Sequence, residues 1–246
     1  MIHGVHLANT SHLHTHFLEV GAKVAEVIHS LRVEQIRTRS TISASRFCLE
    51  SESANRFSHQ TGGILVALPL HVEAELRAMR EARVLDDMRG NRLSADRGVI
   101  LVACADGDQM FDLFTHQAKL LKKDEGHPRL HTLTEHGGAL VLAPGSPLDC
   151  GDNTDKALVR KIIAARRLKA IDTVALYSHF PCAMADEYSV GPIDQLKLQA
   201  KAKDRVKAEV DGIRVSLFLH VHWQDEQRRT YHVSRKRFED WLRKRE

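Results

Sequence analysis

The sequence predicts an α/β protein with a mainly parallel central sheet, helices on both faces of that sheet and an antiparallel hairpin at its carboxyl-terminal edge. Three short apolar segments, at residues 99–104, 139–143 and 173–178, alternate with segments of helical spacing. This order is typical of β-α-β units, whose parallel strands are buried on both faces and joined by right-handed crossovers. From residue 213 to 223 every second residue is hydrophobic, which predicts a strand with two different faces. A further strand at 230–234 follows a turn and would complete the hairpin as an edge strand.

The helices that connect these strands are predicted from the helical spacing of their apolar residues. The first is expected at residues 71–89, ahead of the first strand. Three more are expected at residues 111–123, 154–168 and 192–210. A basic helix that carries Phe238 is expected to close the chain.

Length and composition are typical of a soluble globular chain. Its 246 residues (27.7 kDa) are 43% hydrophobic and 28% charged, and no apolar run approaches the roughly 18 residues that cross a bilayer. No membrane partner is therefore expected. The net charge of +4 is small and dispersed, so nucleic acid is not an expected partner either.

The chain divides into two regions of different character. Residues 1–68 are expected to form an N-terminal extension that is partly disordered or helical, and residues 69–246 a compact domain. The alternating His12, His14 and His16 in the extension could hold a metal or form a solvated tract. No charged segment followed by an apolar stretch opens the chain, so a cytoplasmic location with reduced cysteines is expected.

Four chemically distinctive residues follow two of the expected strands. Cys104 and Asp106 come at the end of the first strand, and His179 and Cys182 follow the strand at 173–178. Ligand sites in open α/β sheets gather at the carboxyl ends of strands, and two thiolates with one imidazole are donors that zinc prefers. A cysteine nucleophile activated by His179 is an alternative, and so are cysteines buried simply as small hydrophobic residues.

The motifs at these positions resemble those of the zinc-dependent β-class carbonic anhydrases. Members of that family have Cys-x-Asp-Ser-Arg after the first strand and His-x-x-Cys after a later one. This chain reads Cys-Ala-Asp-Gly-Asp at 104–108 and His-Phe-Pro-Cys at 179–182, and the resemblance spans roughly residues 70 to 235. The domain at 69–246 is thereby expected to be a divergent zinc domain with the fold of that family.

The resemblance implies a carbonate dehydratase-type zinc lyase, which hydrates CO2 reversibly to bicarbonate by zinc-bound hydroxide. Zn2+ would be held by Cys104, His179 and Cys182. Asp106 would be the catalytic residue, either beside the zinc-bound water or as a fourth ligand in a closed form. Zinc lowers the pKa of bound water to about 7, which suits this chemistry near neutral pH.

Two further features are implied by the same resemblance. Gly137 and Gly138 lie in the glycine-bearing loop between the motifs, where their backbone N–H groups would bind the substrate anion. The same glycines would also suit a tight turn into the strand expected at 139–143. A homodimer or higher homo-oligomer is expected, with CO2 or bicarbonate as the small-molecule partner.

One departure from the family motif leaves other functions open. The Arg that holds the family's Asp away from the metal is matched here by Asp108. Arg92 or Arg97 could replace it from the segment before the strand. Otherwise the chain could be a non-catalytic or regulatory zinc-binding protein, or a hydrolase of a CO2-like substrate such as CS2 or COS.

A second group of histidines lies on the alternating strand near the carboxyl terminus. His220 and His222 share one face of that strand with Arg214. They could form a small metal or anion site, a polar sheet face or a subunit contact.

Overall fold

A computed structural model describes residues 68–87, 93, 95–121, 129–149, 151–223 and 227–245. The expected extension at 1–68, with its histidine tract, lies outside the described residues except for Leu68. Cys48, Arg92 and Cys150 lie outside them as well.

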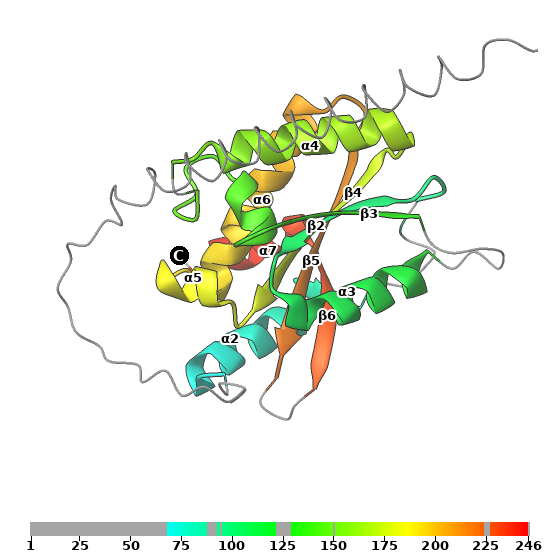
Figure 1. Cartoon of the computed structure of the whole chain (residues 1–246). Coiled ribbons are helices and arrows are strands. Elements are labelled where there is room, and N and C mark those ends of the chain that lie inside the picture. Colours follow the sequence, from blue (N-terminus) through cyan, green and yellow to red (C-terminus); the bar gives the residue numbers. More distant parts are fainter. Residues whose placement is uncertain are drawn as a thin grey trace, which may run out of the picture. The chain divides into compact units, whose positions relative to one another are not determined.

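Six strands form one mixed sheet, which confirms the predicted α/β fold with its antiparallel edge (Figure 1). The strands lie in the order β1-β6-β5-β4-β2-β3, and β5, β4, β2 and β3 are parallel to their neighbours in that series. β6 pairs antiparallel with β5, and β1 pairs antiparallel with β6. The strand bounds are β1 Leu85–Asp86, β2 Val99–Cys104, β3 Leu130–Glu135, β4 Thr173–Phe180, β5 Arg214–His222 and β6 Arg228–Val233.

Helices cover both faces of this sheet, also as predicted. Their bounds are α2 Leu70–Glu81, α3 Gly107–Leu120, the 3-10 helix η2 Gly138–Leu142, α4 Thr154–Lys169, α5 Ala183–Glu187, α6 Pro192–Glu209 and α7 Arg235–Arg243. The larger hydrophobic cluster joins one sheet face to residues of α2, η2, α4, α6 and α7. The smaller cluster joins the other face to α3.

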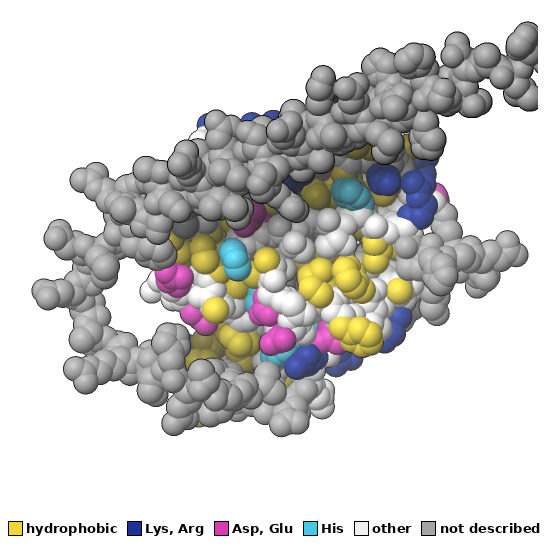
Figure 2. All heavy atoms as spheres, viewed as in Figure 1, with side chains coloured by type: hydrophobic (Ala, Val, Ile, Leu, Met, Phe, Trp, Pro, Cys, Tyr) yellow, Lys and Arg dark blue, Asp and Glu magenta, His cyan; other side chains and the backbone are white. Residues whose placement is uncertain are grey.

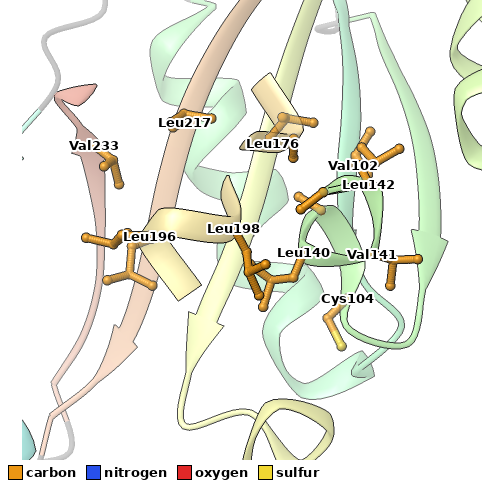
Figure 3. Packing of buried hydrophobic residues seen from close by; sticks show 14 of the residues in the cluster. Val102, Cys104, Leu140, Val141, Leu142, Leu176, Leu196, Leu198, Leu217 and Val233 are labelled. Atoms are coloured by element: carbon orange, nitrogen blue, oxygen red, sulfur yellow. The ribbon is translucent and has the colours of Figure 1, made fainter. Parts of the chain in front are cut away.

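The packing on the larger side is formed by aliphatic side chains of several elements (Figure 3). Val102, Leu176 and Leu217 of three neighbouring strands are buried there beneath η2 and α6. Cys104 lies at the end of this layer in Figure 3, near Leu140 and Val141. The carboxyl end of β2 is therefore held against η2 by hydrophobic packing.

The apolar segment at 139–143 is not a strand, so that prediction is wrong. It forms the 3-10 helix η2, which is buried at every residue, while the neighbouring strand is β3 at Leu130–Glu135. Gly137 and Gly138 both have left-handed φ values, +76° and +55°, which turn the chain out of the extended conformation. A continuous apolar run signals burial on all sides, and a helix packed between a sheet and α6 satisfies that pattern as well as a strand does.

Two further boundaries differ from the prediction. The first helix ends at Glu81 and is followed by β1, which pairs outside β6, so β6 is not the edge strand. β5 is also buried on both faces rather than exposing one polar face. His220 and His222 of its second face lie beside Asp112 of α3 and are buried, whereas Arg214 at the start of the strand is exposed.

Candidate metal centre

Two cysteines and one histidine meet at the carboxyl ends of neighbouring strands. Cys104 is the last residue of β2, His179 is the penultimate residue of β4, and Cys182 comes two residues after β4. β2 and β4 are parallel neighbours, so their carboxyl ends lie at the same edge of the sheet. One ligand atom from each residue lies within 4.8 Å of the other two. The structure therefore brings together the three residues expected to hold a metal.

The donors of this group are buried and fit a metal ion chemically. The exposed fractions are 8% for Cys104, 4% for His179 and 3% for Cys182, and both cysteines are free thiols. Neither ring nitrogen of His179 has a hydrogen-bond partner among the described residues. Buried polar atoms without a partner cost free energy, and coordination to a metal would satisfy one of these nitrogens. Two sulfurs and one imidazole nitrogen form a zinc-type donor set.

The two thiols interact strongly with each other. A hydrogen bond from Cys182 lowers the pKa of the Cys104 thiol, and contacts with His179 lower it further, although burial opposes the shift. The same interaction with Cys104, together with burial, raises the pKa of Cys182. The pair therefore favours one thiolate even before a cation is present. Thiolates are the form in which cysteine binds metals and also the form in which it acts as a nucleophile.

Asp106 lies beside this group and is held by the start of α3. It is the N-cap of α3, and its Oδ1 accepts a hydrogen bond from the backbone N–H of Asp108 at 3.0 Å. Its Oδ2 lies 4.0 Å from Nε2 of His179. Asp106 is not a member of the three-donor group. The carboxylate thus faces the metal donors while its other oxygen is fixed by the helix terminus.

No arginine among the described side chains forms an ion pair with Asp106. Arg97 forms no ion pair in this part of the chain, and Arg92 lies outside it. Arg228 contacts the first turn of α3, where its Nη1 donates to the carbonyl of Asp108 at 3.4 Å. That contact involves the backbone and does not restrain the carboxylate of Asp106.

The glycine-bearing loop lies directly against the end of β2. A Cβ atom on Gly138 would lie 2.4 Å from the backbone nitrogen of Cys104 and 2.6 Å from the carbonyl carbon of Ala103. A Cβ on Gly137 would lie 2.5 Å from a methyl carbon of Leu148. The loop can therefore approach the metal donors this closely because residue 138 lacks a side chain.

A second donor group lies under α3, and one of its members was not predicted. His220 and His222 of β5 meet Asp112 of α3, with one ligand atom of each within 4.8 Å of the others. Arg214 is not part of this group, because it lies six residues earlier on the strand, about 20 Å away, where it pairs with Asp172 at 2.6 Å. Asp112 is four residues before His116, so both occupy one face of α3, but that spacing alone does not show which strand the face contacts.

The basic helix at the end of the chain is packed and charge-paired. Phe238 is 2% exposed and stacks with Trp241. Arg235 pairs with Asp204 and Glu239, and Arg243 pairs with Asp240. None of the described helices combines the length and the apolar composition that crossing a bilayer requires.

Comparison with known proteins adds little to this picture. No protein-family model and no curated protein sequence matches the chain. A crystal structure of a carbonic anhydrase from Streptococcus mutans aligns with 68% of this chain and 99% of that chain, at 10% identity and a TM-score of 0.35. Similarity at this level does not establish a shared fold. The chain is thus an α/β protein with a cysteine-histidine-cysteine group that could hold a metal ion, and its function has to be argued from that group.

Proposed function

We propose that the chain is a zinc-dependent enzyme that reversibly hydrates CO2 to bicarbonate. The observation that supports this most directly is the group of Cys104, His179 and Cys182 at one sheet edge, with the carboxylate of Asp106 beside it. Three protein donors leave one position of a tetrahedral zinc ion for water or substrate, which is the arrangement of catalytic rather than structural zinc sites. Zinc held there would supply a nucleophile near neutral pH, because it lowers the pKa of water to about 7.

Asp106 would orient the attacking water in this reaction. Its Oδ1 accepts a hydrogen bond from the backbone N–H of Asp108, and its Oδ2 lies 4.0 Å from Nε2 of His179, one of the three donors. A carboxylate oxygen in that position accepts a hydrogen bond and thereby aims a lone pair of the water at the carbon of CO2. This role needs Asp106 to remain a neighbour of the metal rather than become its fourth ligand.

Gly137 and Gly138 would complete the site as the substrate-binding loop. Gly138 contacts the backbone of Cys104, so this turn adjoins the metal donors. Backbone N–H groups in a left-handed turn form a concave site that suits an anion such as bicarbonate. The proposal gives these glycines two roles, a close approach to β2 and contact with the substrate.

The resemblance further implies a homodimer or a higher homo-oligomer, and a cytoplasmic location is proposed separately from the resemblance. Two aromatic side chains of α3 support an assembly: Phe111 is 78% exposed and Phe114 is 38% exposed. A partner subunit would remove them from water. Sedimentation of the full chain, with Phe111→Ser as the variant, tests whether this helix is part of a subunit contact.

A non-catalytic zinc-binding protein is the second candidate. The observation that favours it is Asp108 in place of the family's Arg, together with the lack of an arginine paired with Asp106 among the described residues. Without a cationic partner, Asp106 could shift onto the metal and close the fourth position. The two candidates therefore differ in the position of one carboxylate.

Zinc content and stopped-flow CO2 hydration, measured from about pH 6.5 to 9, distinguish the two. In an enzyme, the group of Cys104, His179 and Cys182 should bind about one zinc ion per chain. The hydration rate should increase as the pH rises, because the nucleophile is the deprotonated form of water. Asp106→Asn should lose most of the activity and keep the zinc, whereas Asp152→Asn, at an exposed aspartate, should change neither. Zinc without hydration in the wild type, with activity gained in Asp108→Arg, would establish the non-catalytic candidate.

Cys104→Ser tests the metal ligands in the same assay. It should lower both zinc content and activity, and Cys48→Ser serves as the matched control. Full hydration activity without zinc would overturn the proposal, as would activity that survives Cys104→Ser. The rates with COS and CS2, measured on the same samples, show whether a CO2-like molecule is the better substrate.

A further inference from the structure

The second donor group, formed by Asp112, His220 and His222, has the composition of a metal site. The three residues come from α3 and β5, and one ligand atom of each lies within 4.8 Å of the other two. Nε2 of His220 lies 3.6 Å from Oδ2 of Asp112. Donors around a tetrahedral zinc ion are about 3.4 Å apart when each bond is about 2.0–2.1 Å. This separation suits a shared ion, and it exceeds the usual length of a hydrogen bond between the two groups.

The backbone directs all three side chains to the same place. His220 and His222 are two residues apart on β5, so they point to the same sheet face as Phe218. α3 crosses that face, because His116 packs edge-on against Phe218 with 5.3 Å between the ring centroids. Asp112 lies one turn before His116 on the same side of α3, which brings its carboxylate over the two histidines. Figure 2 shows acidic and histidine side chains beside one another near the start of α3.

His220 is oriented in the way that metal-binding histidines usually are. Its ring is 1% exposed, and its Nδ1 lies 2.8 Å from Oγ1 of Thr230 on the neighbouring strand. A ring that donates from Nδ1 to a hydroxyl carries its lone pair on Nε2, the atom that faces Asp112. The Thr230 contact is therefore compatible with the tautomer that binds a metal through Nε2.

Two buried nitrogens in this group have no other partner. Nε2 of His220 and Nε2 of His222 form no hydrogen bond with any described residue, and His222 as a whole residue is 8% exposed. A buried polar atom left unpaired typically costs about 1–3 kcal/mol. Asp112 lies close to both histidines, and a divalent cation bound between them would accept a lone pair from each ring.

Arg228 is the cation that competes for the same carboxylate. Its Nη1 lies 3.4 Å from Oδ2 of Asp112, a long contact for an ion pair. Arg228 is 42% exposed and Asp112 is 28% exposed, so the arginine can remain solvated when Asp112 binds an ion. The exposed side of Asp112 also offers a path from solvent to the two buried nitrogens.

We propose that Asp112, His220 and His222 hold a second divalent transition-metal ion, distinct from the ion of the cysteine group. Two imidazoles and one carboxylate without a thiolate suit zinc, iron(II) or cobalt(II), and they leave positions for water or another small ligand. His179 and His220 are partners in the register of β4 and β5, so the two ions would lie on adjacent strands. This assignment is independent of CO2 hydration, because it names different donors.

Cobalt(II) titration of the metal-free full chain tests the proposal by absorption and by equilibrium binding. Cobalt bound to thiolates has an intense near-ultraviolet charge-transfer band, whereas cobalt bound to imidazole and carboxylate has only weak visible bands. The wild type should bind one equivalent with the charge-transfer band and at least one without it. The double variant Asp112→Asn/His222→Gln should lose about one equivalent of the second kind and keep the charge-transfer band.

Matched controls separate this result from other histidines in the chain. Asp152→Asn, at an exposed aspartate, and His131→Gln, on β3, should bind as the wild type does. The tract at His12, His14 and His16 is present in every variant, so it does not affect the difference between them. The double variant Cys104→Ser/Cys182→Ser should remove the charge-transfer band and leave the second binding event in place, even if the chain hydrates no CO2.

An unchanged number of bound cobalt ions in the folded double variant would overturn the proposal. Thermal unfolding and circular dichroism establish whether that variant is folded. If it is not, the single variant Asp112→Asn decides the question, since it preserves the size and shape of the side chain. A wild-type titration that reports only thiolate-bound cobalt would overturn the proposal as well.

Discussion

The two donor groups of this protein lie on adjacent strands but differ in composition and in how the chain assembles them. The cysteine group draws its donors from the ends of β2 and β4, whereas the histidine group takes two donors from within β5 and one from α3. The first therefore depends on how strand ends pack against η2, and the second on how α3 lies across the sheet. Thiolates favour softer ions, while imidazole and carboxylate donors accept a wider range. One sheet can therefore carry two different metal-binding groups, because different helices, η2 and α3, pack beside them.

The largest effect is expected from Gly138→Ala, which should disrupt the cysteine group without changing any of its donors. Gly138→Ala would place a Cβ against the backbone of Cys104 and force a left-handed conformation on alanine. We expect a loss of about 3 kcal/mol or more in the free energy of unfolding, with loss of the thiolate-to-cobalt band. Urea unfolding and cobalt absorption measure the two effects.

Gly145→Ala is the matched control for that experiment. Gly145 also has a left-handed φ value, +70°, but a Cβ atom on it would have no neighbouring atom within 4 Å. In this variant the free energy of unfolding should fall only by the conformational cost of about 1–2 kcal/mol, and the cobalt band should remain. Equal losses in both variants would show that the contact with Cys104 is unimportant.

The next effect weakens the histidine group alone. Thr230→Val removes the hydroxyl that contacts Nδ1 of His220 and so removes a restraint on the ring. Loss of such an outer contact typically lowers metal affinity by about 10–100-fold. Calorimetric titration with cobalt should show this decrease in affinity for the histidine group. The affinity of the cysteine group, which gives the charge-transfer band, should not change.

Thr132→Val, on β3, is the control for Thr230→Val. β3 is separated from β5 by two other strands, so this change should leave both binding events unaltered. If Thr230→Val binds as tightly as the wild type, the hydroxyl does not orient His220.

A smaller effect concerns His116, a partly buried histidine on the side of α3 that packs against the sheet. Burial lowers the pKa of His116 to about 4, with a smaller contribution from Lys119, and its Nδ1 contacts the Tyr177 hydroxyl. Between about pH 6.5 and 4 the unfolded chain binds this proton and the folded chain does not. Stability should therefore fall as pH falls through that window, by at most about 1.4 kcal/mol per pH unit for one proton.

His116→Gln isolates that contribution. In metal-free protein, the variant should lose stability less steeply than the wild type as the pH is lowered from about 6.5 to about 4. Chemical unfolding at several pH values provides the slopes. Parallel slopes for the two proteins would show that His116 does not titrate differently in the folded state.

The smallest expected effect is an increase in the affinity of the histidine group for cobalt. Arg228→Gln removes the cation that lies 3.4 Å from Oδ2 of Asp112, so cobalt should bind there a few-fold more tightly. Contacts between exposed charges are worth about 0–1 kcal/mol, which limits the gain. Arg229→Gln is the control, because that neighbouring arginine pairs with Asp87 instead. Weaker binding in Arg228→Gln would show that the arginine supports the group.

The cysteine group was predictable from sequence because its members lie at strand ends that the pattern marks clearly. The apolar segment 99–104 and the strand starting at Thr173 were both identified, and parallel neighbours bring their carboxyl ends together. The proposed roles of Asp106, Gly137 and Gly138 remain predictions from the resemblance. The segment at 139–143 was misread because its apolar run reports burial, which a 3-10 helix provides equally well.

The histidine group was predictable only in part. The period of β5 placed His220 and His222 on one face, yet it placed Arg214 there too. Arg214 lies far from the histidines because it is six residues earlier along the extended strand. Asp112 lies beside them because α3 packs across the sheet at this point. Nothing in the spacing of α3 identifies the strand that it covers.

The sequence by itself determined the α/β class, three of the parallel strands (β2, β4 and β5), the antiparallel end of the sheet and the donor types at two strand ends. These follow from local periodicity and from residue chemistry, which act within a few residues along the chain. Only the tertiary structure decided that η2 replaces a strand, that β1 lies outside β6, and that Asp112 joins His220 and His222. Those features depend on contacts between segments up to about 150 residues apart, whose free energy comes from burial and close packing and is not encoded in any local pattern.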